Sequence, residues 1–242
     1  MNKETTKYSE SFKIRASEVD QNGRATLPAI CSLFQEVAGN HALKLSFDIT
    51  QLHEQNLTWV LHRMDIKINR FPEWRETVTI ETWPAAGDAL RAYRDYRILD
   101  RDGNEIGCCL SYWMMINIKT RRPNRMPKEV LELRLSEIDH VLPVKTSRMK
   151  PFDDEGNAIK SYIKVRRSDL DMNDHVNNAR YVEWMLETFD NEKVNINQID
   201  IMFLQESRAG DSITSERRDL SDSYQHQLKD QDGKILALAE CR

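Results

Sequence analysis

Three side chains of different chemistry stand two residues apart, just before an apolar helical pattern. Asp171, Asn173 and His175 supply a carboxylate, an amide and an imidazole. Residues two apart point away from each other on a regular helix, so these three can converge only in a loop or an extended segment. Imidazole is the side chain best suited to proton transfer near neutral pH, and helix-entrance N–H groups stabilise a developing oxyanion. The stretch therefore suits hydrolysis of an activated acyl group, with Asp171 orienting His175 and Asn173 holding a carbonyl or a water.

The same stretch has other interpretations. Asp and Asn before a helix are common caps and a single histidine is usually structural, so a structural role stays open. The spacing also matches the start of a calcium loop, but that loop needs glycine at its sixth position and glutamate at its twelfth. Val176 and Val182 stand there instead. No His-x-x-His or cysteine cluster indicates zinc, so the sequence predicts neither a metal nor a cofactor.

A fainter copy of this stretch lies near the start of the chain, without the histidine. Four residues repeat at one fixed offset: Ser17, Asp20, Asn22 and Glu36 match Ser168, Asp171, Asn173 and Glu187. Two further pairs follow in the same order: Asp65 and Glu76 match Asp200 and Asp211, and Asp102-Gly103 matches Asp232-Gly233. Three matches in one order indicate an internal duplication. One copy then carries the chemistry and the other is a scaffold.

Each copy must supply elements that position these residues. The first half shows a strand-like run at 8–15, a helical apolar spacing from Leu27 with Pro28 in the first turn, and strand-like runs at 58–69, 76–83, 92–100 and 105–118. A short helix is expected at 130–138. The second half repeats the order, with a strand at 162–165, a helix at 177–190 and strands at 198–205, 212–218, 223–229 and 235–241. The pattern predicts an α+β fold with a duplicated unit.

Composition narrows the function classes. The 242 residues suit one large domain or two of about 120 each. The net charge of −4 disfavours nucleic acid, because phosphate binding needs a basic surface. No stretch approaches the ~18 apolar residues of a membrane span, and the first residues lack the apolar core of a signal peptide. Four cysteines without CxxC spacing indicate reduced thiols. We therefore expect a cytoplasmic protein without membrane insertion.

Residues 168–187, SDLDMNDHVNNARYVEWMLE, resemble the signature of acyl-[acyl carrier protein] thioesterases, plant plastid and bacterial enzymes that release free fatty acid. The first half is similar to the same family at 33–41, 59–64, 70–74, 82–83 and 113–122. The resemblance implies a tandem (double) hotdog, each a long central helix wrapped by a curved antiparallel β-sheet. It implies an acyl-binding N-terminal hotdog at 1–130, a linker at 131–160 and a catalytic C-terminal hotdog at 161–242.

The resemblance also implies the site. Asp171, Asn173 and His175 match the family's catalytic groups directly, and a downstream Glu-Cys pair falls on Glu206 and Ser207. Glu206 is then a candidate base for activating water, or a partner for His175. Serine in place of cysteine argues against an obligatory thiol nucleophile. Ser207 is either a weak nucleophile or a polar neighbour, and we favour the second role.

Two further groups follow from the resemblance. The first half of the family binds the acyl chain, for which the candidate lining residues here are Phe34, Val37, Trp59, Trp83, Trp113 and Met114. For any single one of them, ordinary core packing is the favoured role. The carrier protein is acidic, so a basic docking surface is expected. The candidates for that surface are Arg121, Arg122, Arg166 and Arg167.

The expected function is hydrolysis of fatty acyl-[acyl carrier protein] thioesters to free fatty acid and carrier protein, which ends fatty acid synthesis. Shorter forms of the motif occur in single-hotdog acyl-CoA thioesterases, so acyl-CoA hydrolysis is the second interpretation. A non-catalytic module that binds the acyl chain or the carrier protein is the third. Two hotdogs in one chain already mimic the usual hotdog dimer, and a further homodimer is left open.

Overall fold

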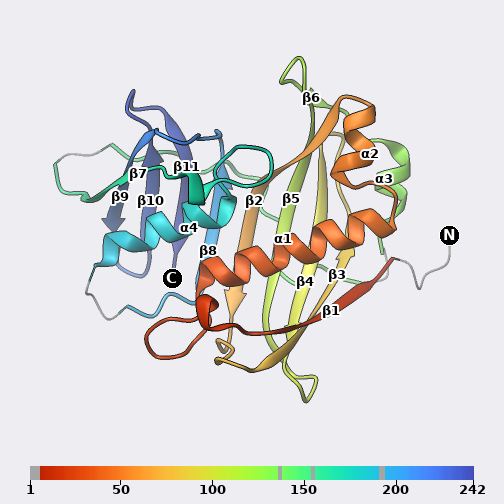
Figure 1. The fold of residues 1–242 in the computed structure, drawn as a ribbon, viewed down its shortest axis with the longest axis horizontal. Coiled ribbons are helices and arrows are strands. Elements are labelled where there is room, and N and C mark those ends of the chain that lie inside the picture. The colour runs from red at the N-terminus through yellow and green to blue at the C-terminus, as the bar shows by residue number, and fades with distance from the viewer. Residues whose placement is uncertain (1–5, 136–137, 154–155, 191–193) are drawn as a thin grey trace. The chain divides into compact units, whose positions relative to one another are not determined.

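The computed structural model describes residues 6–135, 138–153, 156–190 and 194–242. The chain divides into two compact units, Met1–Lys145 and Thr146–Arg242. In each unit an α-helix lies against an antiparallel sheet (Figure 1). The predicted α+β fold with a duplicated unit is confirmed, whereas the domain boundaries 1–130 and 161–242 stay a prediction. Within the described residues, no helix combines the length and the apolar character that crossing a membrane requires.

The first unit has a sheet of five long strands and one short one. Their order is β1 (Tyr8–Lys13), β3 (Thr77–Pro84), β4 (Arg91–Leu99), β5 (Glu105–Asn117) and β2 (Leu57–Ile68), with β6 (Pro123–Asn124) paired to β5. All these pairings are antiparallel. The strands expected from alternation lie within two residues of these bounds, because the strands are long and turn residues separate them.

Helix α1 (Leu27–Lys44) crosses one face of this sheet (Figure 1). It begins where the Thr26 side chain accepts the Ala29 N–H, and Pro28 occupies its first turn. Its buried stripe includes Phe34, whose ring lies 4.8 Å from that of Tyr96 on β4. Burying each such apolar side chain contributes roughly 1.5–3 kcal/mol. We call the sheet face that carries Tyr96 the inner face and the opposite one the outer face.

Two short helices close one end of the first unit. Helix α2 (Ile49–Glu54) and helix α3 (Lys128–Glu132) each place an apolar residue in the same buried cluster, Leu52 and Val130 respectively. Helix α3 lies at the start of the range in which a short helix was expected, and residues 136 and 137 of that range lie outside the described residues. Helix α2 was not predicted, although the Asp48 and Gln51 side chains form a capping box at its start.

Residues 138–145 lie on the outer face of the first unit, and we call them the strap. His140 Nδ1 lies 2.9 Å from Asp95 Oδ2, and Lys145 Nζ lies 2.6 Å from Asp65 Oδ2. Both carboxylates are almost fully buried, and burial raises the pKa of Asp95. The strap belongs to the segment predicted as a linker, so part of that segment is anchored to the first unit by the His140–Asp95 hydrogen bond and the Lys145–Asp65 ion pair.

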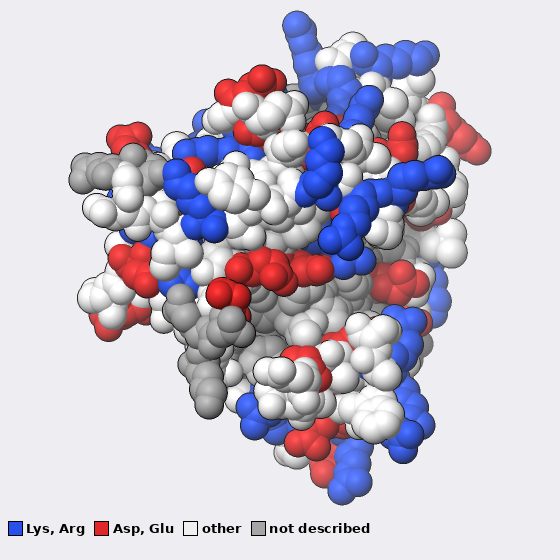
Figure 2. Space-filling view, turned by 60° about the vertical axis from the view of Figure 1, so that its left-hand side comes forward, with Lys and Arg blue, Asp and Glu red and all other residues white. Residues whose placement is uncertain are grey.

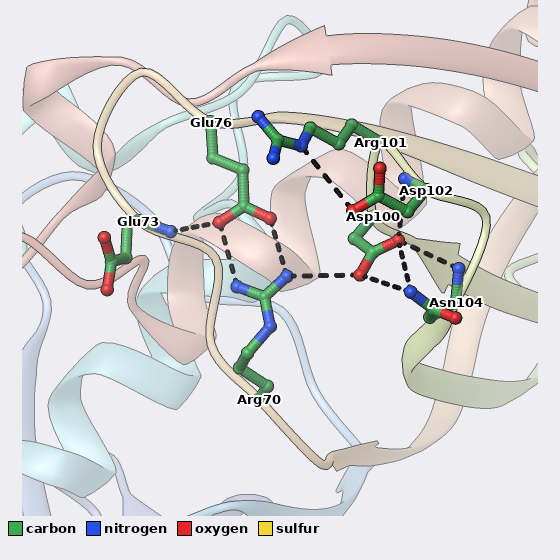
Figure 3. Close-up of polar contacts among 7 residues, drawn as sticks. All are labelled: Arg70, Glu73, Glu76, Asp100, Arg101, Asp102 and Asn104. Atoms are coloured by element: carbon green, nitrogen blue, oxygen red, sulfur yellow. Dashed lines mark hydrogen bonds and ion pairs between the residues drawn. The ribbon is translucent and has the colours of Figure 1, made fainter.

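A polar network joins two turns of the first unit (Figure 3). The Arg70 guanidinium donates two hydrogen bonds to the Glu76 carboxylate, at 2.9 and 2.7 Å, and lies 3.8 Å from Asp100 Oδ2. Asp100 in turn accepts the N–H groups of Asp102 and Asn104, which closes the hairpin between β4 and β5. Gly103 in this hairpin has φ +84°, as its Asp-Gly sequence predicts.

The second unit repeats the arrangement in smaller form. Its strand order is β8 (Gln198–Phe203), β11 (Ile235–Cys241), β10 (Tyr224–Lys229), β9 (Ser212–Asp219) and β7 (Ile159–Lys164). Helix α4 (Asn178–Leu186) has 9 residues where α1 has 18. The helix expected to reach Asp190 ends earlier. A 3-10 turn follows at Glu187–Phe189, where the Thr188 hydroxyl donates to Met185 O at 2.7 Å, and Asp190 has a φ of +46°.

Strands β9 and β10 carry buried polar side chains. Arg217 donates to the carbonyl of Thr188 at 2.9 Å and stacks over the Phe189 ring at 4.2 Å. His226, opposite Arg217 in the ladder, is 1% exposed, and neither ring nitrogen has a hydrogen-bond partner among the described residues. Burial, assisted by the Arg217 charge, lowers the pKa of His226 to about 3. The imidazole is therefore neutral in the folded protein at neutral pH.

Candidate active site

A tight loop leads into helix α4 and carries the candidate catalytic residues. The Asp171 N–H donates to the His175 carbonyl at 2.7 Å, and Asp174 between them has a φ of +61°. The Asp171 carboxylate accepts the N–H groups of Asn173 at 2.8 Å and His175 at 3.4 Å. Aspartate is common in such turns because its side chain bonds the backbone two residues on. The loop therefore holds its shape through Asp171.

The structure brings His175 and Glu206 together. His175 Nε2 lies 3.3 Å from Glu206 Oε2, and the two side chains are 22% and 35% exposed. Glu206 follows strand β8, and its loop is held against the His175 loop because the Val176 N–H donates to the Ser207 carbonyl at 2.9 Å. An imidazole and a carboxylate at this distance can share a proton, and their exposure leaves room for a water. The pair is thus built for acid–base chemistry.

The contacts of Asp171 and Asn173 differ from the expected ones. Every hydrogen bond that the Asp171 carboxylate makes within the described residues goes to a backbone N–H, and none reaches the imidazole. We expected Asp171 to orient the His175 ring directly, but the structure shows no hydrogen bond between them. Asp171 instead holds the backbone of the loop that carries His175. The Asn173 side chain is exposed and makes no hydrogen bond within the described part of the chain. Its amide is available to a carbonyl or a water.

The entrance of helix α4 was expected to offer free N–H groups, and this expectation is wrong for four of them. The N–H groups of Val176, Asn177, Ala179 and Arg180 all donate within the second unit, to the carbonyls of Ser207 and Asp169 and to the side chain and carbonyl of Asn177. The Asn177 cap accounts for two of them, since its side chain accepts the Ala179 N–H and its carbonyl the Arg180 N–H, each at 2.9 Å. An oxyanion must therefore find its donors elsewhere.

Ser207 is a buried anchor of the Glu206 loop. Its side chain is 1% exposed, and its Oγ accepts a hydrogen bond from the Tyr181 hydroxyl at 3.0 Å. Tyr181 Oη also lies 3.2 Å from the Gln205 carbonyl, and burial raises the pKa of Tyr181 to about 12. A neutral tyrosine cannot remove the serine proton, so Ser207 lacks an activating base there. Sequence reasoning missed Tyr181, although it stands inside the signature, in the first turn of α4.

The first unit contains the same loop without its chemistry. The Asp20 N–H donates to the Arg24 carbonyl at 2.8 Å, and the Asp20 carboxylate accepts the N–H groups of Asn22 at 2.8 Å and Arg24 at 3.0 Å. The Ala25 N–H donates to the Pro72 carbonyl, as the Val176 N–H does to Ser207. The aspartate is thus retained where no imidazole follows, which supports a scaffolding role for it in both loops.

The six candidate acyl-lining residues lie on two different faces. Phe34 and Val37 belong to α1, and Trp59 and Trp113 lie on the inner face that α1 covers. The other two candidates, Trp83 and Met114, lie on the outer face. Trp83 stands opposite Asp95 in the ladder, next to the strap, and Met114 is opposite Arg91. One space between helix and sheet cannot be lined by both sets.

The candidate docking arginines are all exposed. Arg121 and Arg122 lie in the turn after β5 in the first unit. Arg166 and Arg167 precede the catalytic loop in the second unit, where the Arg166 N–H donates to the Asp169 carboxylate at 2.7 Å. That carboxylate reaches back as part of a capping box, as Glu18 does to Arg15 in the first unit. The second pair therefore stands on the same short scaffold as His175.

Comparison with known proteins shows which protein family the chain matches. The acyl-ACP thioesterase N-terminal domain matches residues 5–133 and the acyl-ACP thioesterase C-terminal domain matches residues 153–242. Two curated relatives are 32% identical. The chloroplastic oleoyl-acyl carrier protein thioesterase of Coriandrum sativum aligns over 97% of this chain and 69% of its own length. The chloroplastic oleoyl-acyl carrier protein thioesterase 1 of Arabidopsis thaliana aligns over 86% of this chain and 63% of its own length.

Solved structures agree with the sequence relatives. An acyl-ACP thioesterase from Bacteroides thetaiotaomicron is 27% identical, with a TM-score of 0.90 over 100% of this chain and 99% of its own. The 12:0-ACP thioesterase from Umbellularia californica is 25% identical, with a TM-score of 0.83 over 98% of this chain and 96% of its own. The predicted double hotdog is confirmed by these matches. With both of its halves matched by the two domains of one family, the chain belongs to the acyl-ACP thioesterases.

Proposed function

We propose that this chain hydrolyses fatty acyl-ACP thioesters and releases a free fatty acid and the carrier protein, the reaction that ends fatty acid synthesis. Its family makes it a thioester hydrolase. The observation that carries the proposal is the contact of His175 Nε2 with Glu206 Oε2 at 3.3 Å on two partly exposed loops. The pair supplies the proton acceptor that attack by water needs.

The proposed reaction uses water as the nucleophile. Glu206 and His175 take one proton from a water, whose oxygen bonds the thioester carbon. The Asn173 amide donates to the carbonyl oxygen as negative charge develops on it. The carbon–sulfur bond then breaks, and the proton held by His175 and Glu206 passes to the sulfur of the carrier-protein thiol. Asp171 holds the loop in which Asn173 and His175 lie, and Ser207 holds the loop of Glu206.

We propose that residues 1–130 bind the acyl chain, that 131–160 link the halves and that 161–242 carry the catalysis. The candidates that share the space between α1 and the inner face support acyl binding there, and they are Phe34, Val37, Trp59 and Trp113. Trp83 and Met114 lie on the other face. Their contribution is to packing rather than to that space.

Docking of the acidic carrier protein is proposed at exposed arginines. Arg166 and Arg167 directly precede the catalytic loop, and Arg121 and Arg122 extend from the first unit. Lys and Arg side chains form separate groups on the face shown in Figure 2, with Asp and Glu side chains among them. Local basic groups of this kind steer a partner despite a net charge of −4.

The four cysteines are buried free thiols, which supports the proposed cytoplasmic location, a reducing compartment. Pairing of two chains into a homodimer stays a prediction, and sedimentation measures it.

One comparison tests the function. The same acyl group is offered on carrier protein and on CoA, and the released acid and thiol are quantified. We expect a higher kcat/KM for the carrier-protein thioester, by about 10-fold or more. A preference for CoA would make the chain an acyl-CoA thioesterase. Tight binding of acyl-ACP with no acid released would make it a binding module, and either result would overturn the proposal.

A further inference from the structure

The interior of the first unit contains a guanidinium with unusual partners. Arg94 lies on the inner face of β4, where its Nη1 donates to His41 Nδ1 at 2.9 Å and to Thr82 Oγ1 at 3.2 Å. Because arginine stays protonated, His41 must accept with an unprotonated Nδ1. Both partners are therefore uncharged at this contact. Within the described residues, the Arg94 side chain has no carboxylate partner and Nη1 makes all of its hydrogen bonds.

Arg94 lies where the close-packed part of the inner face ends. On one side of it, Tyr96 and its ladder neighbour Cys109 are 0% exposed. On the other side, Ala92 and its neighbour Trp113 are partly exposed. Arg94 itself lies deep enough that burial lowers its pKa, yet its side chain keeps some accessible surface. The inner face is therefore partly accessible to solvent at Arg94 and at its neighbours Ala92 and Trp113.

The side chains around this accessible part of the inner face are polar on one side. Ser111 stands opposite Arg94 in the ladder and is fully buried, and its Oγ accepts the Trp113 Nε1–H at 2.7 Å. Thr82 and His41, the two partners of Arg94, are also buried. A plain hydrocarbon placed here would cover the remaining guanidinium N–H groups without accepting from them. Leaving such donors unpaired in a desolvated site is unfavourable, and a site built this way selects ligands that carry an acceptor.

We propose that Arg94 recognises an oxygen atom carried on the acyl chain, so that the substrate class includes fatty acyl thioesters bearing a hydroxyl or keto group. The Nη2 and Nε groups donate to that oxygen, while Nη1 stays on His41 and Thr82. The inference rests on the proposed acyl-binding role of the first unit. Arg94 takes no part in the chemistry, so the hydrolysis is unchanged. It is a specificity-determining residue.

The native protein tests this without any substitution. Carrier-protein thioesters of one chain length are prepared in plain form and with a hydroxyl or a keto group at successive positions. We expect at least one oxygenated chain to exceed the plain chain in kcat/KM by about 10-fold or more, since the net value of one hydrogen bond to a charged donor corresponds to such a factor. Equal or lower values at every position would overturn the proposal.

Substitutions then locate the effect. Arg94→Met, which keeps length but loses the donors, should abolish the preference and raise kcat/KM for the plain chain, whereas Arg94→Lys should keep part of it. Arg97→Met is the matched control, because Arg97 lies on the same strand but on the outer face, 3.1 Å from Glu105. A preference that survives in folded Arg94→Met would contradict the inference. If Arg94→Met does not fold, the native comparison decides.

A binding measurement tests the Arg94 site independently of the proposed hydrolysis. Free hydroxylated and plain fatty acids are titrated into His175→Ala protein, which needs no turnover. A preference for the hydroxylated acid supports the Arg94 site even if no thioester is hydrolysed, whereas hydrolysis without any preference for oxygen supports the function and removes the site.

Discussion

Arg24 in the first unit occupies the place of His175 in the second. The carbonyl of each accepts the N–H of the aspartate four residues earlier, at 2.8 Å from Asp20 and 2.7 Å from Asp171. The N–H of each is in turn held by that aspartate's carboxylate. The two loops thus share one backbone framework and differ in the side chain at its end, which is Arg24 in the first unit and His175 in the second. The framework and the chemistry can therefore be tested separately.

Removing the imidazole or the carboxylate should abolish most activity. His175→Ala and Glu206→Gln are each expected to lower kcat/KM by about 100-fold or more, the usual scale for a general base. Both side chains are partly exposed, so the melting temperature should change little. Thiol release from acyl-ACP measures the rate. Arg24→Ala is the control at the matching position and should stay within about twofold of the native protein. Near-native turnover in His175→Ala would exclude the proposed mechanism.

Asp171 should tolerate replacement by an amide. Because its oxygen accepts two backbone N–H groups, Asp171→Asn keeps an acceptor and is expected to lose less than about 10-fold in kcat/KM, whereas Asp171→Ala loses more. Both should act mainly on kcat.

The matching changes at Asp20 control for loop stability. Asp20→Ala should destabilise the protein by about 1 kcal/mol with kcat unchanged. If Asp171→Asn were as inactive as His175→Ala, the carboxylate charge itself would be needed, and the backbone role would be refuted.

Ser207 should be dispensable for turnover. Ser207→Ala removes the acceptor of the Tyr181 hydroxyl, which costs about 1 kcal/mol of unfolding free energy because that hydroxyl keeps the Gln205 carbonyl. We expect kcat to fall by less than about fivefold. Chemical denaturation measures the first quantity and steady-state kinetics the second.

Tyr181→Phe is the matched variant on the other side of this hydrogen bond and should behave alike. Covalent catalysis would show itself instead as an acyl group on Ser207 by mass spectrometry, together with an inactive, folded Ser207→Ala protein.

His226 should make the protein acid-sensitive. The unfolded chain binds a proton at this histidine near pH 6.5, whereas the folded protein binds it only near pH 3. Between these values the unfolded state holds more protons, so stability falls as the pH falls, by about 1.4 kcal/mol per pH unit. Urea unfolding at pH 7, 6 and 5 measures the slope. His226→Leu should flatten it, whereas His53→Leu, at an exposed position, should leave it unchanged. An unchanged slope in His226→Leu would show that another group is responsible.

Lys145 of the strap should contribute to the stability of the protein. Lys145→Met removes the ion-pair partner 2.6 Å from Asp65, a carboxylate that is 1% exposed. Because Lys145 is itself 31% exposed, we expect a loss of about 2 kcal/mol rather than the full cost of a buried pair. Denaturant unfolding measures the loss. Adding Asp65→Asn should restore part of it, and a double variant no more stable than Lys145→Met would argue against the ion pair as the cause.

Much of the fold follows from the sequence because its elements are long. Helix α1 and the strands of the first unit have clear periodicity and defined ends at Thr26, Pro28 and Gly103. Helix α2, with six residues, is too short for a periodic pattern to stand out. The predicted end of α4 was too late because the Thr188 hydroxyl bonds the Met185 carbonyl and turns the chain. The spacing of apolar residues does not predict that hydrogen bond.

The sequence predicts which residues form the candidate site but not the contacts that they make. Spacing brought Asp171 and His175 to one loop, yet whether a carboxylate bonds a ring or a backbone depends on the loop's φ angles, such as that of Asp174. The division of the candidate lining residues between two faces was not foreseen either. The sequence alone does not give the register between strands, and only the observed pairing of β3 and β5 with β4 shows that Trp83 and Trp113 face opposite sides.

The strap ends at Lys145, and four residues later the Met149 N–H lies 3.3 Å from Met202 Sδ in the second unit. Only residues 146–148, all exposed, lie between these anchors. For protein engineering this short stretch is the natural crossover point for chimaeras. An N-terminal half exchanged there keeps the contacts of its own strap with Asp65 and Asp95, so such chimaeras would test whether the first half sets the chain-length preference.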